Sequence, residues 1–237
     1  MRLKHFAALA AALGMGALIP YSVRSADNPQ PRVTTFDEIN VHRLNIVEPN
    51  GRYRLVLSNS ARFPGLFMNG QEYRHHNRTG GGMLFFNDDG DEVGGLTFRS
   101  NAANRSASAG ITFDQYKQDQ TVSMLHGEAN GQRQAGVRVW DRPDYSIEPL
   151  MQMSDRAARA TNDADRQRIR GEMQAFVQAN GGGGAERFFA GKQQGDALVR
   201  LADPQGRPRL VMRVGTDGQP SIEFLDENGR VTRRIAQ

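Results

Sequence analysis

Short runs in which apolar and polar residues alternate follow one another from Val41 onward, separated by Gly, Asn and Asp. The clearest runs are Leu44-x-Ile46, Tyr53-x-Leu55-x-Leu57, Met83-x-Phe85 and Val137-x-Val139. Successive side chains of a β-strand point to opposite faces, so this period of two predicts strands with one face toward a core. The pattern therefore predicts a single β-rich domain over residues 41–237.

A shared turn pattern, apolar-x-apolar-x-acid-x-amide-Gly, ends at five glycines: Gly51, Gly90, Gly131, Gly206 and Gly229. The four residues ending in each glycine suit a type I turn, because an Asp or Asn in first position can bond the turn's own backbone. Glycine takes the left-handed conformation that closes a bulged hairpin. We therefore expect five equivalent structural turns. They predict an all-β fold of antiparallel hairpin repeats, arranged as a propeller, a barrel or a sandwich.

The alternation stops between about residues 148 and 180. Apolar residues there recur every three or four positions: Leu150, Met153, Ala157, Ala160 and Ala164, then Ile169, Met173 and Phe176. Thr161 or Asn162 can cap the second helix, and the glycines from Gly181 can end it. This stretch is predicted to be a helical insertion in the β domain.

The first 25 residues have the parts of a secretory signal peptide. Arg2 and Lys4 precede an uncharged, largely apolar run over residues 6–19, and a polar stretch ends at Ser25. A spanning helix needs about 20 apolar residues, which favours a cleaved signal over an uncleaved anchor formed by 6–19. Residues 26–40 are polar and predict a tether. The domain is expected to be exported, periplasmic or extracellular, and to meet a membrane only through an uncleaved N-terminal segment.

Composition narrows the classes of chemistry. The 237 residues include no cysteine, which excludes disulfides, thiolate zinc sites and cysteine nucleophiles. Arg2, Lys4 and Arg24 belong to the predicted signal, which leaves 27 of the 30 basic residues against 26 acidic ones. These charges are mixed along the chain, whereas a nucleic-acid surface needs a clustered basic face. Nucleic acid is therefore not an expected partner.

One acidic stretch raises the question of a metal site. Asn87, Asp89 and Asp91 supply oxygen atoms at alternate positions, as the first residues of a calcium loop do. That loop requires glycine in sixth position, but here Glu92 stands sixth and Gly90 fourth. A structural turn is the simpler interpretation, and a metal site formed by these three residues stays the alternative. No cofactor is predicted.

Two polar stretches could bind a ligand. The stretch over residues 73–77 contains two histidines and is followed by three glycines. If these histidines lie on a loop, they could ligate a metal or act as a base. In the second, exposed aromatic rings beside charged groups could stack on sugars or peptides. The simpler alternatives are a surface loop and the edge of a core. The candidate ligand-binding residues are Tyr73, His75, His76 and Asn77, together with Trp140 and Tyr145.

Several stretches resemble a family of uncharacterised exported or membrane-anchored bacterial proteins. The likeness lies in F-P-G-L at 63–66, G-x-E-Y at 70–73, N-D-x-G at 87–90 and F-D-Q-Y-x-Q-D-Q at 113–120. It extends from about residue 36 to 144 and resumes in "DPQGRPRLVMRV" and "FLDENGR", leaving out 148–184. The resemblance implies placement outside the cytoplasm, and it implies no reaction or ligand.

The sequence favours an exported β-repeat protein that binds a partner or serves an envelope-structural role without catalysis. The expected partner is an unidentified protein or glycan outside the cytoplasm. No nucleophile elbow, zinc-protease helix, P-loop or dinucleotide fingerprint occurs. The alternative is an extracytoplasmic hydrolase or metal-dependent enzyme that uses His75 or His76. That alternative requires a histidine within about 3–5 Å of Asp88, Asp91 or Glu92.

Overall fold

The structure is a computed structural model that describes residues 33–76 and 78–236. The predicted signal peptide over 1–25 and the start of the tether lie outside these residues. The chain divides into the units Met1–Ile39 and Asn40–Gln237. In the first unit, residues 33–39 form neither helix nor strand. Among the residues described, no helix has the length and apolar character needed to cross a membrane.

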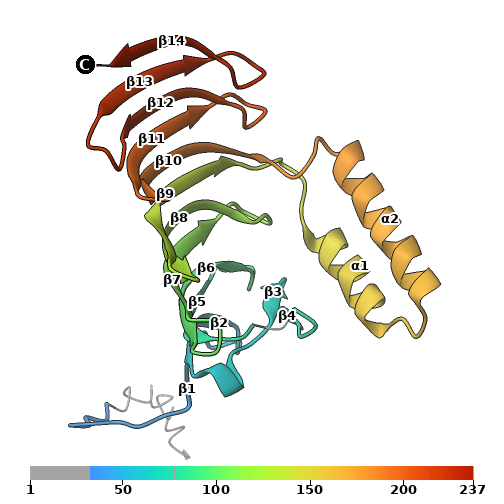
Figure 1. Ribbon diagram of the computed structural model, residues 1–237. Helices are drawn as coiled ribbons and strands as arrows, with labels where there is room; N and C mark the ends of the chain where they lie inside the picture. The colour runs from blue at the N-terminus through green and yellow to red at the C-terminus, as the bar shows by residue number, and fades with distance from the viewer. Residues whose placement is uncertain (1–32, 77, 237) are drawn as a thin grey trace, which may run out of the picture. The chain divides into compact units, whose positions relative to one another are not determined.

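Twelve strands of the second unit form one antiparallel sheet, in which each strand pairs with the next along the chain (Figure 1). These strands are β1 (Arg43–Val47), β2 (Tyr53–Ser58), β5 (Gly81–Phe86), β6 (Glu92–Asn101), β7 (Ser106–Asp114), β8 (Gln120–Ala129), β9 (Gln132–Asp141), β10 (Ala185–Gln193), β11 (Asp196–Ala202), β12 (Pro208–Val214), β13 (Pro220–Leu225) and β14 (Val231–Ala236). The 3₁₀ helix Ser60–Arg62 and the hairpin of β3 (Leu66–Met68) and β4 (Gln71–Tyr73) come between β2 and β5. Helices α1 (Glu148–Arg159) and α2 (Asp163–Ala179) come between β9 and β10. The prediction of an all-β fold with a helical insertion is confirmed.

The finer layout differs from the three that were predicted. The strands follow one linear order from β1 to β14, and the only other described sheet is the small β3–β4 hairpin. Each hairpin continues the hydrogen bonding of the one before it, so the strands are not divided into blades or into two large facing sheets. Turn chemistry predicts hairpins, but it does not determine how one hairpin joins the next.

Four of the predicted turn glycines share one geometry. Gly51, Gly90, Gly206 and Gly229 have φ values between 77° and 83°. Each donates its N–H to the carbonyl three residues before it, at 2.8 to 3.2 Å. In three of these turns the first side chain also accepts backbone N–H groups two and four residues further on: Asn87, Asp203 and Asp226. The side-chain oxygen thus closes the turn from inside.

The turn at Gly131 is of another kind. Asn130 and Gly131 alone connect β8 to β9, with φ values of 52° and 80°, so this is a two-residue hairpin. Because turns of a meander alternate between the two ends of the sheet, Gly131 lies at the end opposite Gly90. The turn equivalent to Gly90 is at 115–118, where Gln118 N–H donates to Gln115 O at 2.9 Å. Its left-handed residue is Lys117, with φ 57°, so the glycine pattern missed it.

One face of the sheet carries an unbroken row of apolar side chains. Every strand contributes one residue, and each residue is the direct cross-strand partner of the next. We call this row the apolar ladder: Leu44, Leu57, Met83, Leu96, Ile111, Met124, Val137, Ala190, Val199, Met212, Ile222 and Ile235. None of the twelve is buried.

The core lies on the opposite face. Apart from glycines, the buried residues of the twelve strands all point there: Val56, Ser58, Leu84, Phe86, Ser123, Phe189, Ser221 and Glu223. Phe67 of β3 packs on Val56, Leu84 and Phe86. Of the residues in the clearest alternating runs, Tyr53 packs against this core, and the others lie on the face of the apolar ladder. The expectation that these residues face a core therefore holds for Tyr53 only. The β3–β4 hairpin covers residues that lie between the alternating apolar positions in the sequence, such as Val56 and Leu84.

The helical insertion is a hairpin of two helices that pack mainly on one another (Figure 1). Asn162, one of the two predicted caps, accepts the N–H of Asp165 at 2.8 Å and begins α2. Ile169 is the buried residue of the pair. Contacts of α1 with residues 69–75 and of α2 with Tyr145 join the insertion to the β-strands and their connections.

Candidate functional site

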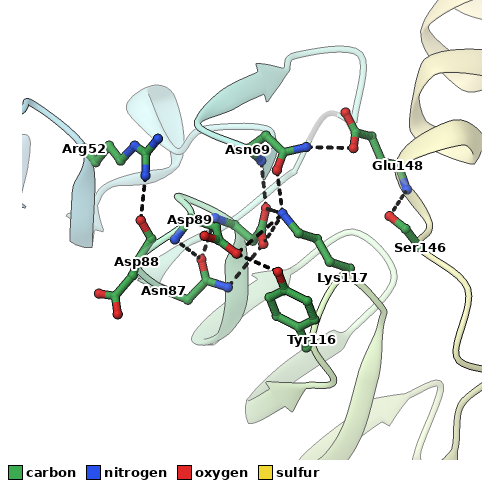
Figure 2. A network of polar contacts seen from close by, with 10 residues as sticks. Arg52, Asn69, Asn87, Asp88, Asp89, Tyr116, Lys117, Ser146 and Glu148 are labelled. Atoms are coloured by element: carbon green, nitrogen blue, oxygen red, sulfur yellow. Dashed lines mark hydrogen bonds and ion pairs between the residues drawn. The ribbon is translucent and has the colours of Figure 1, made fainter.

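The side chains predicted as metal ligands belong to a network around the 87–91 turn (Figure 2). Asn87 Oδ1 accepts the N–H of Asp89 at 3.0 Å and that of Asp91 at 2.9 Å. Asp203 and Asp226 make the same pair of bonds in their own turns. The oxygen of Asn87 therefore has a turn-closing role that needs no metal.

A protein cation lies among the same oxygen atoms. Lys117 Nζ is 2.8 Å from Asp91 Oδ2 and 3.8 Å from Asp89 Oδ2. Asp91 is 1% exposed and also accepts the backbone N–H of Asn69 at 2.7 Å. Over 33–76 and 78–236, no three His, Cys, Asp or Glu residues are grouped so that they could hold a metal ion. The ammonium of Lys117 supplies positive charge to the buried Asp91 carboxylate.

The protonation equilibria of this pair agree with that role. Burial would raise the pKa of Asp91, but hydrogen bonds from Asn69, Lys117 and Asn87 outweigh it and hold the pKa below its usual value. Burial would lower the pKa of Lys117, but the hydrogen bond and charge of Asp91 outweigh it and raise the pKa. Both shifts favour the charged pair, so the contact is a structural ion pair.

The network also joins segments that are far apart in the sequence. Asn69, between β3 and β4, donates its side-chain amide to Glu148 Oε2 of α1 at 2.7 Å. Ile147 N–H donates to Lys117 O at 2.9 Å, just before α1 begins. Tyr116 O–H donates to Asp89 at 2.7 Å. These bonds attach the start of the helical insertion to the turns at 87–91 and 115–118 (Figure 2).

The predicted histidine stretch runs from the end of β4 into a loop. Tyr73 is 3% exposed. His75 Nδ1 lies 3.3 Å from Asp155 Oδ1 of α1, although neither ring nitrogen has hydrogen-bond geometry with a described partner. His76 is an exposed residue, and partial burial of its ring together with the charge of Arg78 lowers its pKa. Asn77 lies outside the described residues.

A buried ionic cluster close to this loop was not predicted. Arg78 Nη2 contacts both carboxylate oxygens of Glu92, at 2.7 and 2.8 Å. Burial raises the pKa of Glu92, although the charge and hydrogen bond of Arg78 oppose this shift. Asp114 Oδ1 is buried without a hydrogen bond. Burial, with a smaller effect of the charges of Glu92 and Asp119, raises the pKa of Asp114 to about 7.

The sequence gives little sign of this cluster. Arg78, Glu92 and Asp114 come from a loop and two strands, and each looks like an ordinary surface charge in a mixed sequence.

Among the described residues, no hydrogen bond or ion pair joins either histidine to Asp88, Asp91 or Glu92. His75 lies instead beside α1, and Glu92 is held by an arginine.

The two aromatic candidates are half-buried beside the insertion. Tyr145 O–H donates to Gly182 O at 3.0 Å, and its ring meets that of Phe176 edge-on at 5.3 Å. Tyr145 thus holds the end of α2. Trp140 lies under the guanidinium of Arg142, whose central carbon is 5.6 Å from the ring centre. Both rings make intramolecular contacts that account for their positions.

The polar face of the sheet is neutralised by its own ion pairs. Phe189, 1% exposed, lies between the guanidinium groups of Arg138 and Arg200, at 4.9 and 5.4 Å from the ring centre. Both arginines pair with Glu186 at 2.6 Å. Further along the sheet, Arg213 and Arg234 pair with Glu223 at 3.0 and 3.6 Å. These charges have partners within the chain.

The apolar face has no such partner among the residues described. We define the apolar face as the apolar ladder together with a second row beside it: Ile46, Leu55, Phe113, Val122, Val139, Phe188, Leu201, Leu210 and Phe224. At its centre Met124 is 59% exposed, and at its two ends Leu44 and Ile235 are 42% and 48% exposed.

Comparisons with protein-family models, with curated proteins and with solved structures found no match to this chain.

Proposed function

We propose that this chain is an exported, non-catalytic β-sheet protein that binds a partner or builds structure outside the cytoplasm. The observation that carries the proposal is the exposure of the apolar face. The largest apolar patch of a typical soluble monomer covers about 300–600 Å². Here an unbroken apolar row crosses all twelve strands, while the polar face holds the buried residues. A surface of this kind is stable in water when something covers it.

Placement outside the cytoplasm is supported by the sequence. Residues 1–25 have the charged, apolar and polar parts of a secretory signal, and 26–40 have the composition of a tether. The absence of cysteine is compatible with an oxidising compartment, because no free thiol is present to be oxidised.

The enzymatic alternative has less support. It requires His75 or His76 to meet Asp88, Asp91 or Glu92. Glu92 is bound instead by Arg78, Asp91 by Lys117, and His75 lies beside Asp155. Each carboxylate that this enzyme would use is committed to a cation or to a turn.

The test places one added charge on either side of the same strand. Leu96 belongs to the apolar ladder, and Thr97, its neighbour, is exposed on the polar face. Full-length chains carrying Leu96→Glu or Thr97→Glu are produced in bacteria, and gently prepared extracts are separated by native size. We expect the native chain and Thr97→Glu to run in the same large complex and Leu96→Glu to run as a single folded chain. Identical profiles for all three would contradict a binding role of the apolar face.

A further inference from the structure

We propose that the apolar face is covered by a second copy of this chain, so that the working form is a face-to-face homodimer. This inference rests on the proposed function, because it names the partner of the same surface. It goes beyond that function because a binding protein could equally receive a different molecule on this face.

The area of the apolar face suits a stable protein interface. A fully buried apolar side chain loses about 60–120 Å² of accessible surface, so the partly exposed side chains of this face together amount to on the order of 1000 Å². A standard interface buries about 800 Å² on each partner. The face therefore exceeds the patch of a typical monomer and matches one side of a dimer interface. Phe98 and Val214, two residues from Leu96 and Met212 in their strands, extend this face on the other side of the ladder. Eleven residues of the face as defined and these two are exposed by 37% to 59%: Leu44, Ile46, Leu57, Leu96, Phe98, Phe113, Val122, Met124, Leu201, Met212, Val214, Phe224 and Ile235.

The chemistry of the face makes it complementary to itself. Every position of the apolar ladder is Leu, Ile, Val, Met or Ala, so the row carries neither charge nor a side-chain hydrogen-bonding group. A two-fold interface brings one patch against an identical patch, which an uncharged surface tolerates without like-charge repulsion. A different partner is usually selected by a pattern of complementary charge, and the ladder has none.

Sheet-on-sheet packing also explains which face remains open. Two sheets pack about 10 Å apart, with side chains from their inner faces interlocking into one core. The polar face cannot serve in this way, because Glu186 and Glu223 and their arginines occupy it. The apolar face of a single chain has the composition of half a sandwich core. A second copy supplies the other half.

The absence of cysteine allows a direct test. Single cysteines are placed in the full chain along the ladder, at Leu44, Leu96, Met124, Met212 and Ile235 in turn. The matched control is Thr97→Cys, which is exposed on the polar face of β6 beside Leu96. After mild oxidation, non-reducing electrophoresis measures the disulfide-linked dimer. A two-fold axis brings each ladder residue near its own copy only close to the axis.

We expect the dimer yield to peak at one ladder position, at least ten-fold above Thr97→Cys, and to fall on both sides of it. Yields along the whole ladder that equal the Thr97→Cys yield would overturn the homodimer. Cross-linking in the cells that produce the chain and maleimide labelling in native extracts distinguish two causes of such a negative result. If ladder cysteines link to another protein, the homodimer is wrong and the proposed binding role stands. If maleimide labels ladder cysteines as fast as Thr97→Cys in native extracts, the face is open and both proposals are wrong.

Discussion

The ammonium of Lys117 lies 2.8 Å from the buried carboxylate of Asp91, so an ion pair joins two residues that are 26 positions apart in the sequence. Lys117 reaches this position from a left-handed backbone conformation, φ 57°, that non-glycine residues rarely adopt. The ion pair thus connects the turn at 115–118 to the turn at 87–91. Its removal leaves Asp91 charged, 1% exposed and without a cation.

We expect Lys117→Met to lower the free energy of unfolding by about 3–5 kcal/mol, the cost of leaving one partner of a buried pair uncompensated. The measurement is urea unfolding followed by circular dichroism. Lys192→Met is the control, because Lys192 is exposed on β10. Equal losses for the two variants would show that the ion pair has no special role.

The second buried pair allows a double-mutant cycle. Arg78→Met leaves Glu92 without its guanidinium, and we expect a loss of about 3–5 kcal/mol. Glu92→Gln in the same chain removes the buried charge, so the double variant should be more stable than Arg78→Met alone. If the two single losses simply add, Arg78 and Glu92 are not coupled, and the cluster is misassigned.

Asp114 predicts a pH dependence of stability. Its pKa is raised from its ordinary value of 3.8 to about 7, so the folded protein binds an extra proton between these values. The stability that this proton contributes is therefore lost as pH rises from about 4 to 7, and it stays lost above 7. Asp114→Asn should make the free energy of unfolding less dependent on pH in this window. It should also stabilise the protein at pH 8 by about 1–3 kcal/mol. An unchanged pH profile would contradict the burial of the Asp114 carboxyl and the raised pKa that follows from it.

Two glycines with open space around them separate backbone strain from crowding. A Cβ atom added at Gly229 or at Gly171 meets nothing within 4 Å. Gly229 has φ 77° in the turn before β14, so Gly229→Ala should cost about 1 kcal/mol of stability. Gly171 lies within α2, where Gly171→Ala should add about 1 kcal/mol. Thermal unfolding measures both, and shifts of the same sign would be inconsistent with the turn geometry.

Local chemistry made part of this fold predictable. The turns at Gly51, Gly90, Gly206 and Gly229 and the two helices follow from residues adjacent in sequence. Gly131 was predicted to close the same kind of turn as the other four glycines, but Asn-Gly also forms a two-residue hairpin. Lys117 was missed because its turn has no glycine. The position of a turn in the sequence therefore does not by itself predict the turn type or the residue that adopts the left-handed conformation.

Long-range contacts made the rest unpredictable. Alternation assigns Leu55 and Val56 to opposite faces, but it does not tell which face the β3–β4 hairpin covers. The structure places Phe67 on the side of Val56 and leaves Leu57 exposed. Arg78 and Glu92 meet only because that hairpin folds back on the sheet. The sequence therefore predicted strands and turns but not the exposed side of the sheet.

Coverage of the apolar face by a second copy is tested most directly by the mass of the native chain in solution. Sedimentation equilibrium is measured on the full chain and on two variants, Phe98→Glu on the apolar face and Thr97→Glu on the polar face of the same strand. We predict twice the chain mass for the native protein and for Thr97→Glu, and a single-chain mass for Phe98→Glu with its circular dichroism unchanged. A native protein that sediments as one chain at micromolar concentration would contradict the account.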